Sequence, residues 1–304
     1  MGDLKARIEG LLAEAAIEAG LAAIGVESGT VLEINAEAPF PTASVFKVPV
    51  MVEVYAQADV GRFGMSDRIV MTERHKTVGS GVLQSLGGGL APTIRDLVTL
   101  MMIVSDNTAT DMLMERIGPG TATARMRALG LMDIHVPLAV HQIFLRGWHL
   151  PVDGVVDYAG QKAAMRELGF DYESGAFARD GTNNVSTARD MARLLAMIGR
   201  REVVSAAACE DMIAVLEQQH YVDRVPRFLP SGASANKTGT LRGLRNDAGL
   251  IRRGAGDTIA YTLYTMDATP MPNGNSRAFA EANARVASVM GEVGAALWED
   301  FGRG

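Results

Sequence analysis

Stretches of strand character lie near both ends of this 304-residue chain, and helical stretches fill the region between them. Gly and Pro turns separate the strands near the C-terminus, and an alanine-rich helix follows them. This order predicts one sheet assembled from both ends of the chain. The expected strands are 21–26, 30–35, 235–240, 247–251 and 258–266, with a further short strand at 68–72. The expected helices are 3–19, 92–104, 108–117, 160–168, one from 187 onward, 209–216 and 276–298, besides one that opens near residue 44.

Composition excludes several classes of protein. Hydrophobic residues make up 48% of the chain and charged residues 21%, as in an ordinary soluble globular protein. The formal net charge of −6 argues against a nucleic-acid partner, since phosphate binding needs clustered Lys and Arg. No run approaches the roughly 20 apolar residues of a membrane-spanning helix, so no membrane partner is expected. The five histidines are scattered and Cys209 is the single cysteine, so we expect no metal, no cofactor and no internal disulfide.

The N-terminal stretch lacks the basic start and continuous apolar core of a secretory signal. Acidic residues interrupt it at positions 3, 9, 14 and 18, and apolar residues recur at helical spacing. We therefore expect a cytoplasmic protein as the sequence is written, and a periplasmic or secreted one if a leader has been removed. The sequence leaves the oligomeric state open.

Ser44 and Lys47 lie three residues apart at the start of an apolar run, 48–54. In a helix this spacing places the hydroxyl and the amine on one face, roughly one turn apart. A serine becomes a nucleophile when a neighbouring base takes its proton, and a lysine can be that base when burial lowers its pKa. Ser-x-x-Lys is a common spacing, so taken alone the pair favours a helix-capping serine and an exposed lysine.

Two later stretches separate these interpretations. Ser105-Asp106-Asn107 follows the apolar stretch 92–104, and Lys237-Thr238-Gly239-Thr240 lies in an expected strand. In this order, Ser-x-x-Lys, Ser-Asp-Asn and Lys-Thr-Gly resemble the active-site set of class A β-lactamases and penicillin-binding proteins. The resemblance covers most of the chain from about residue 20, thins between 130 and 185, and is carried by 79–84, 95–108, 186–193, 223–230 and 236–251.

The resemblance implies an α/β fold of the α+β sandwich kind. It consists of an antiparallel five-stranded sheet flanked by helices and an all-helical part, with the active site in the cleft between them. We accordingly expect a single domain over 1–304. Its sheet part is expected at about 1–40 and 230–304, and its helical part at about 41–229.

The resemblance also implies roles for the catalytic residues. Ser44 Oγ attacks the carbonyl and forms an acyl-enzyme, while the backbone N–H groups of Ser44 and Thr240 form the oxyanion hole. Lys47 accepts the Ser44 proton, directly or through water. Ser105 relays a proton to the leaving nitrogen.

The expected substrate-binding residues are Asn107 and the run Lys237, Thr238, Gly239 and Thr240. Asn107 is expected to bond a substrate acylamide and to steady Lys47. Lys237 and Thr238 are expected to bind a substrate carboxylate, and the Lys237 charge also lowers the pKa of Lys47. Arg242 and Arg245 either reinforce this anion site or are surface charges of a loop.

One family feature is missing. Class A enzymes carry a Glu-x-x-Leu-Asn loop whose glutamate activates the deacylating water, and this sequence has no such motif. The nearest acids in register are Asp171 and Glu173, with Glu167 further upstream. Glu173 is either the deacylation base or a solvated loop acid. Without a base, the acyl-enzyme forms and then persists.

The sequence therefore predicts an enzyme, a serine hydrolase of the class A β-lactamase type that is acylated on Ser44. It hydrolyses β-lactams or a related activated acyl bond, and its deacylation is slow. The expected partner is a small molecule with an activated acyl group and a carboxylate. A cytoplasmic esterase or amidase with the same Ser–Lys pair is the main alternative. A covalent β-lactam sensor and a cell-wall carboxypeptidase are less favoured, because no signalling domain, anchor or leader is visible.

Overall fold

The computed structural model describes residues 1–171, 173–267 and 277–303. The chain divides into two compact units. Unit 1 comprises Met1–Val45 and Ser186–Gly304, and unit 2 comprises Phe46–Val185. None of the helices within the described ranges combines the length and the apolar character needed to span a bilayer.

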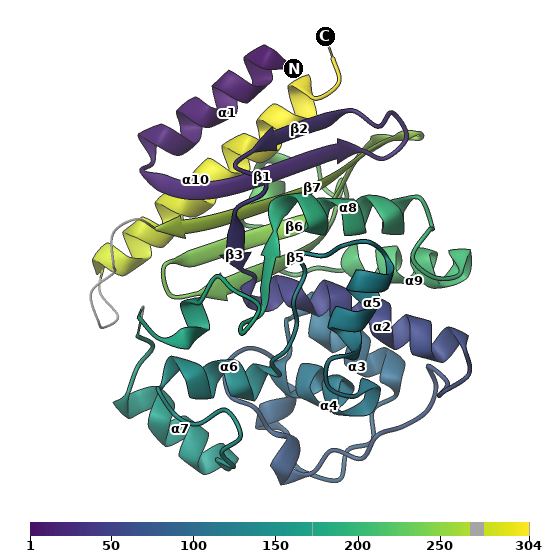
Figure 1. The fold of residues 1–304 in the computed structure, drawn as a ribbon, viewed down its shortest axis with the longest axis vertical. Coiled ribbons are helices and arrows are strands. Elements are labelled where there is room, and N and C mark those ends of the chain that lie inside the picture. The colour runs from purple at the N-terminus through teal and green to yellow at the C-terminus, as the bar shows by residue number, and fades with distance from the viewer. Residues whose placement is uncertain (172, 268–276, 304) are drawn as a thin grey trace. The chain divides into compact units, whose positions relative to one another are not determined.

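Unit 1 is built on a five-stranded antiparallel sheet whose strands come from both ends of the chain (Figure 1). The strand order is β2-β1-β7-β6-β5, so the N-terminal hairpin pairs with the last strand of the C-terminal meander. This confirms the expected fold class and the five expected strands. The strands are β1 (Ile17–Gly25), β2 (Val31–Ile34), β5 (Ser234–Leu241), β6 (Leu244–Gly254) and β7 (Asp257–Asp267).

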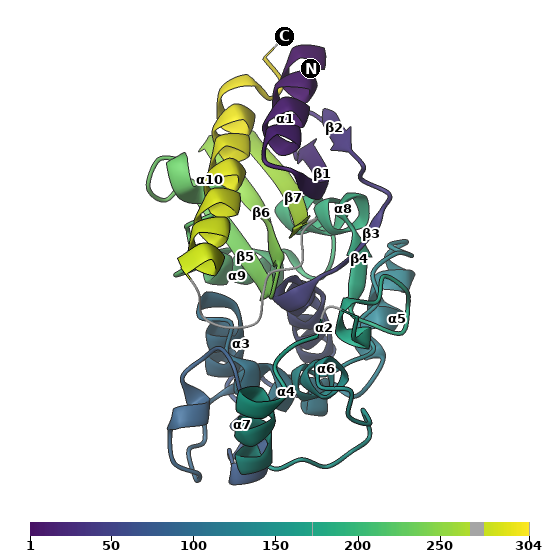
Figure 2. The ribbon, with the colours of Figure 1, turned by 90° about the vertical axis from the view of Figure 1, so that its left-hand side faces the viewer.

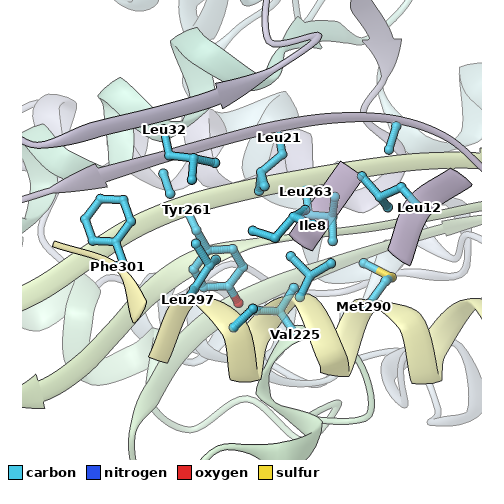
Figure 3. Close-up of a cluster of buried hydrophobic side chains, with 14 of the residues drawn as sticks. Ile8, Leu12, Leu21, Leu32, Val225, Tyr261, Leu263, Met290, Leu297 and Phe301 are labelled. Carbon is cyan, nitrogen blue, oxygen red and sulfur yellow. The ribbon is translucent and has the colours of Figure 1, made fainter. Parts of the chain in front are cut away.

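Helices cover both faces of this sheet. On one face α1 (Gly2–Glu14) and α10 (Arg277–Asp300) lie side by side, as both ribbon views show (Figures 1 and 2). Apolar side chains of these two helices meet those of β1 and β7 in one buried cluster (Figure 3). On the other face α8 (Ala188–Gly199) contacts β1, β6 and β7. The central strands are therefore buried on both sides.

Unit 2 is helical and is organised around α2 (Lys47–Asp59), which contacts α3, α4 and α5. Its residues from Lys47 through Gln57 are all buried, as the apolar run predicts. A second apolar cluster forms around Val78, Leu145 and Trp148. The other helices of unit 2 are α3 (Ile94–Ile103), α4 (Asn107–Ile117), α5 (Thr121–Ala128), α6 (Val140–Gly147) and α7 (Tyr158–Glu167).

Several expected boundaries are wrong. The first helix ends at Glu14 rather than at residue 19, because Ala16 turns the chain with a φ of 52° and β1 begins directly after it. The expected strand at 68–72 is absent, and Arg68 forms only an isolated bridge with Thr93. The short strands β3 (Pro39–Pro41) and β4 (Val185–Thr187), together with α5 and α6, have no counterpart among the expected elements.

The division of the chain also differs from the expected one. The sequence assigned 41–229 to the helical part, whereas unit 2 ends at Val185. Helices α8 and α9 (Ala206–Leu216) belong to unit 1, because α8 contacts the sheet and α9 contacts both α8 and β5.

Candidate active site

Ser44 lies in the 3₁₀ turn η1 (Ala43–Phe46), which runs directly into α2. Ala43 has a φ of 44°, an uncommon conformation for a residue with a side chain. Ser44 is partly exposed, while Thr42, Ala43 and Val45 are buried. The expected helix does open here, with its first turn tightened to 3₁₀, and the hydroxyl of Ser44 is set on the one accessible position of this turn.

Strand β5 passes very close to the turn that carries Ser44. A Cβ atom on Gly239 would lie 2.6 Å from the carbonyl oxygen of Thr42 and 3.2 Å from the backbone nitrogen of Ser44. Only glycine allows this approach of two backbones. Steric contact with the turn therefore explains why position 239 is a glycine. The Ser44 backbone N–H lies beside β5, the strand that also carries Thr240.

Lys237 and Thr238 are buried in β5, and Thr240 is exposed. Lys237 Nζ donates to the carbonyl oxygen of Thr238 at 2.7 Å. In the β5–β6 register, Thr238 lies opposite Asp247. Unit 1 thus holds the serine and the whole Lys-Thr-Gly run, with a buried lysine charge on the strand.

In unit 2, Lys47 is fully buried among three oxygen acceptors. Its Nζ donates to the Ser105 carbonyl oxygen at 2.8 Å, to Ser105 Oγ at 3.0 Å and to Asn107 Oδ1 at 2.9 Å. The structure therefore brings together Lys47, Ser105 and Asn107, three of the residues that the sequence analysis selected. The interpretation of Lys47 as an exposed surface lysine is excluded.

Burial lowers the pKa of Lys47 to about 7, although the charges of Asp106 and Asp111 partly oppose this effect. Desolvation disfavours an ammonium group, so a lysine in this position loses its proton near neutral pH. A neutral amine can accept a proton from a hydroxyl. The pKa of Lys47 is therefore in the range that a general base needs at neutral pH. Ser44 precedes Lys47 by three residues in the same helical run.

The Ser-Asp-Asn segment connects α3 to α4, and its aspartate is structural. Asp106 is buried at the N-cap of α4, where its carboxylate accepts from Ala109 N at 3.0 Å. The same side chain accepts from Val82 N at 2.7 Å and Leu83 N at 2.9 Å. A Cβ atom on Gly81 would collide with Asp106 at 2.3 Å.

The segment 78–80 fits around Asn107. Asn107 Nδ2 donates to the Val78 carbonyl oxygen at 2.8 Å, and Asn107 N donates to the Ser80 carbonyl oxygen at 3.0 Å. Ser80 Oγ donates to the Ser105 carbonyl oxygen at 2.8 Å. These bonds fix two of the three oxygens that accept from Lys47, the Ser105 carbonyl oxygen and Asn107 Oδ1.

Arg224 is a candidate site residue that the sequence analysis missed. Its buried guanidinium donates to the carbonyl oxygens of Gly239 and Asn246 and to Thr240 Oγ1. Burial lowers the pKa of Arg224 to about 10, against the opposing charge of Asp247, so the side chain remains cationic at neutral pH. In the sequence, Arg224 was marked only by lying within 223–230, one of the stretches that resemble class A β-lactamases.

Arg245 lies in strand β6 and has different partners from Arg224. Arg245 Nε donates to Asn283 Oδ1 of α10 at 2.9 Å, and burial lowers its pKa. Arg245 is therefore attached to a helix of unit 1 rather than being a solvated loop charge. The role of Arg242 in an anion site stays a prediction.

The acids that the sequence analysis considered for deacylation, Glu167, Asp171 and Glu173, are all exposed. Asp171 accepts from Glu173 N at 3.0 Å and contacts His149 Nε2 at 2.7 Å, and these two bonds lower the pKa of Asp171. Among the described residues, no group of three or more His, Cys, Asp or Glu could hold a metal ion.

A five-stranded antiparallel sheet with flanking helices, a serine one turn before a buried lysine, and the two further motifs define a β-lactamase-like serine hydrolase fold. The comparison with family models agrees with this class. The chain belongs to the β-lactamase enzyme family, whose model matches residues 3–301.

Individual relatives are distant but cover most of the chain. The β-lactamase regulatory protein BlaB of Streptomyces cacaoi is 24% identical over 267 residues, which are 80% of this chain and 82% of that protein. The crystal structure of a β-lactamase from Sphaerobacter thermophilus matches with a TM-score of 0.75 at 25% identity, and the match covers 95% of this chain and 94% of that chain. The structure of PBP-A matches with a TM-score of 0.76 at 21% identity, and the match covers 98% of this chain and 96% of that chain.

Proposed function

We propose that this protein is a serine hydrolase that is acylated on Ser44 by β-lactams or a related activated acyl compound that bears a carboxylate. The observation that carries the proposal is the buried Lys47, whose pKa is about 7 and whose Nζ is held by Ser105 and Asn107. A lysine of this kind is a base at neutral pH. Three residues before it stands a partly exposed serine.

In the proposed acylation, neutral Lys47 takes the Ser44 proton while Oγ attacks the acyl carbonyl carbon. The backbone N–H groups of Ser44 and Thr240 are proposed to stabilise the oxyanion. Ser105, bonded to Lys47 through its own Oγ, passes a proton to the leaving nitrogen. The cations on β5 and beside it, Lys237 and Arg224, are proposed to attract the substrate carboxylate.

Deacylation is proposed to be slower than acylation, because Glu173 and Glu167 are exposed and the family's loop motif is absent. A persistent acyl-enzyme would also suit a β-lactam sensor. The named relative BlaB of Streptomyces cacaoi is a β-lactamase regulatory protein, which supports the sensor as a second candidate. An esterase or amidase with the same Ser–Lys pair is the third.

One experiment separates the three. The protein is mixed with penicillin G, with nitrocefin and with a panel of p-nitrophenyl esters, and intact mass and product release are followed together. A burst of about one equivalent and a slow steady phase, with the mass raised by one ligand, is the expected result with the two β-lactams. Fast ester turnover without β-lactam labelling would identify an esterase, and an adduct that never turns over would identify a sensor.

The variant Ser44→Ala tests whether Ser44 is the acylated residue. It removes one hydroxyl from a partly exposed turn and is expected to keep the fold, as circular dichroism would check. All covalent labelling should be lost. A label that peptide mapping places on any other residue would overturn the assignment of Ser44.

A further inference from the structure

Unit 2 contains a hollow that the acylation chemistry does not use. Its volume is about 630 Å³, which lies within the roughly 300–1,000 Å³ of sites that bind small molecules. The lining residues come from α6, from the stretches on either side of it and from the segment 175–182, so all of them belong to unit 2. None of the residues proposed for acylation is among the described residues that line this hollow.

The described lining residues combine an apolar wall with two basic side chains and include no acid. The basic side chains are those of Arg146 and His149. An apolar body that carries one negative group would complement this lining, because its apolar surface leaves water while its anion meets a guanidinium. The apolar wall consists of Leu138, Leu150, Pro151 and Val152.

The guanidinium of Arg146 is held against the backbone of Gly175. Its Nη1 donates to the Thr182 carbonyl oxygen, and its Nη2 donates to Thr182 Oγ1 at 3.2 Å. These two bonds use two of the five N–H groups of a guanidinium. Thr182 Oγ1 in turn donates to Asp180 at 2.6 Å, so a hydroxyl joins the arginine to this acid. A Cβ atom on Gly175 would lie 2.6 Å from both Nε and Nη2 of Arg146, so the glycine makes room for the guanidinium.

His149 occupies the position directly after the C-cap of α6, with a φ of 57°. Leu150 N donates to the Leu145 carbonyl oxygen at 2.8 Å, and His149 N donates to the carbonyl oxygen of residue 146 at 3.1 Å, as in a Schellman motif. Glycine usually fills this position, because it adopts a positive φ without strain. His149 Nε2 lies 2.7 Å from Asp171 Oδ2 and donates to it, since an ionised carboxylate only accepts. Nδ1 is then the ring nitrogen that can meet a ligand, and the helix end alone does not explain a histidine here.

We propose that this hollow is a second binding site, for a small organic carboxylate with an apolar body. The carboxylate accepts hydrogen bonds from the Arg146 guanidinium, whose planar fork matches it. The imidazole of His149 is a further polar contact of the ligand, and the apolar body lies against Leu150 and Val152. Binding is non-covalent and needs no reaction at Ser44, so the site goes beyond the proposed function and can be tested without a β-lactam.

The first test compares phenylbutyrate with phenylbutyramide, two ligands that share one apolar body, by titration calorimetry. The parent protein should bind the carboxylate at least about tenfold more tightly than the amide, because a charged acceptor makes a stronger bond to a guanidinium. Arg146→Gln should remove this difference. Arg74→Gln is the control and should keep it, because Arg74 is an exposed arginine of unit 2 that pairs with Glu115 at 3.1 Å. Equal binding of the two ligands by the parent, or no binding of the carboxylate, would overturn the inference.

Two valines test whether the carboxylate binds in the hollow. Val152 lines it and is 37% exposed, whereas Val155 is 100% exposed and is not among the described lining residues. Val152→Asp sets a negative charge in the apolar wall and should weaken phenylbutyrate binding by at least about tenfold. Val155→Asp makes the same change outside the hollow and should leave the affinity unaltered. A parent-like affinity in Val152→Asp would mean that the carboxylate binds elsewhere, for example beside Lys237, and the inference would fail.

Two further variants separate binding from stability. In His149→Gly the backbone conformation suits the new residue and the lost pair with Asp171 is exposed, so the urea midpoint should stay or rise. Phenylbutyrate binding should nevertheless weaken by about threefold or more, because a polar contact of the ligand is lost. In Gly175→Ala the new methyl group displaces only the flexible end of Arg146, so binding should weaken while the fold is kept. A lower urea midpoint with parent-like binding in His149→Gly would show a purely structural histidine, and parent-like binding in both variants would overturn the site.

Discussion

Lys47 Nζ donates a 2.8 Å hydrogen bond to the carbonyl oxygen of Ser105, a residue whose backbone is left-handed, with a φ of 56°. A residue with a side chain pays roughly 1–2 kcal/mol for this conformation. The surrounding bonds hold it there, since the same carbonyl also accepts from Ser80 Oγ at 2.8 Å. Strain at Ser105 is thus part of how the lysine is bound.

The first prediction separates the effect of the backbone strain at Ser105 from the effect of losing its hydroxyl group. Ser105→Gly and Ser105→Ala both remove Oγ, but only glycine adopts a positive φ without strain. We expect Ser105→Gly to be more stable than Ser105→Ala by about 1 kcal/mol in urea unfolding. Both variants should acylate slowly because the proton relay is lost. Equal stabilities would show that the backbone at Ser105 carries no strain.

The second prediction concerns the pH dependence of acylation. Because burial lowers the pKa of Lys47 to about 7, its neutral, basic form predominates above that pH. The acylation rate should fall about tenfold per pH unit below pH 7 and level off above it. Stopped-flow measurement of the nitrocefin burst from pH 5 to 9 tests this. Lys47→Arg keeps a permanent charge and should abolish the burst at every pH. A flat profile in the parent would exclude Lys47 as the base.

The strands and the three motifs could be predicted because their signals are local. Each strand is a run of apolar and β-branched residues between turns, and each motif spans four residues or fewer. The motif order also selected Lys47, Ser105 and Asn107, and in the structure hydrogen bonds join these three residues. The division between sheet part and helical part was missed because α8 packs on the sheet, and nothing in its own sequence distinguishes that partner from another helix.

Apart from the expected helix at 160–168, which the structure confirms as α7, the region from 133 to 186 could not be predicted, for a physical reason. Helix α6 has eight residues and depends on a distant group, since Asp111 accepts from its first two backbone N–H groups. The apolar cluster there joins Val78 to Leu145 and Trp148, across long sequence separations. Arg224 was missed similarly, because its partners Gly239 and Asn246 lie on strands that pairing brings beside it.

The third prediction follows from the close approach at Gly239. In Gly239→Ala the new methyl group would meet the Thr42 carbonyl oxygen at 2.6 Å, so β5 and the turn before Ser44 must separate. Overpacking of this kind lowers stability by about 1–3 kcal/mol, and we expect acylation to slow by more than about tenfold. Gly10→Ala, where a Cβ meets nothing within 4 Å, is the control and should leave both quantities unchanged or improved. A fully active Gly239→Ala protein would argue against this contact.

The fourth prediction tests Asp106 as the anchor of the segment that surrounds Asn107. Asp106→Ala leaves three buried or half-buried N–H groups, those of Val82, Leu83 and Ala109, without their acceptor. Each lost partner costs about 1–3 kcal/mol, so unfolding free energy should fall by at least about 3 kcal/mol. Asp157→Ala removes the N-cap of α7, which makes one exposed bond to Gly160, and should cost only about 1 kcal/mol. Equal losses in the two variants would contradict the anchoring role.

The last prediction concerns the proposed recognition of a substrate carboxylate by Lys237, which is buried in β5. A hydrogen bond from an ammonium to a carboxylate is worth about 1.5–3 kcal/mol, and a neutral ester forms no such bond. Lys237→Ala should therefore lower kcat/KM for penicillin G about 10- to 100-fold more than for a neutral p-nitrophenyl ester. Because both substrates are measured on the same preparation, partial unfolding cancels in the ratio. An equal loss on both would rule out carboxylate binding by Lys237.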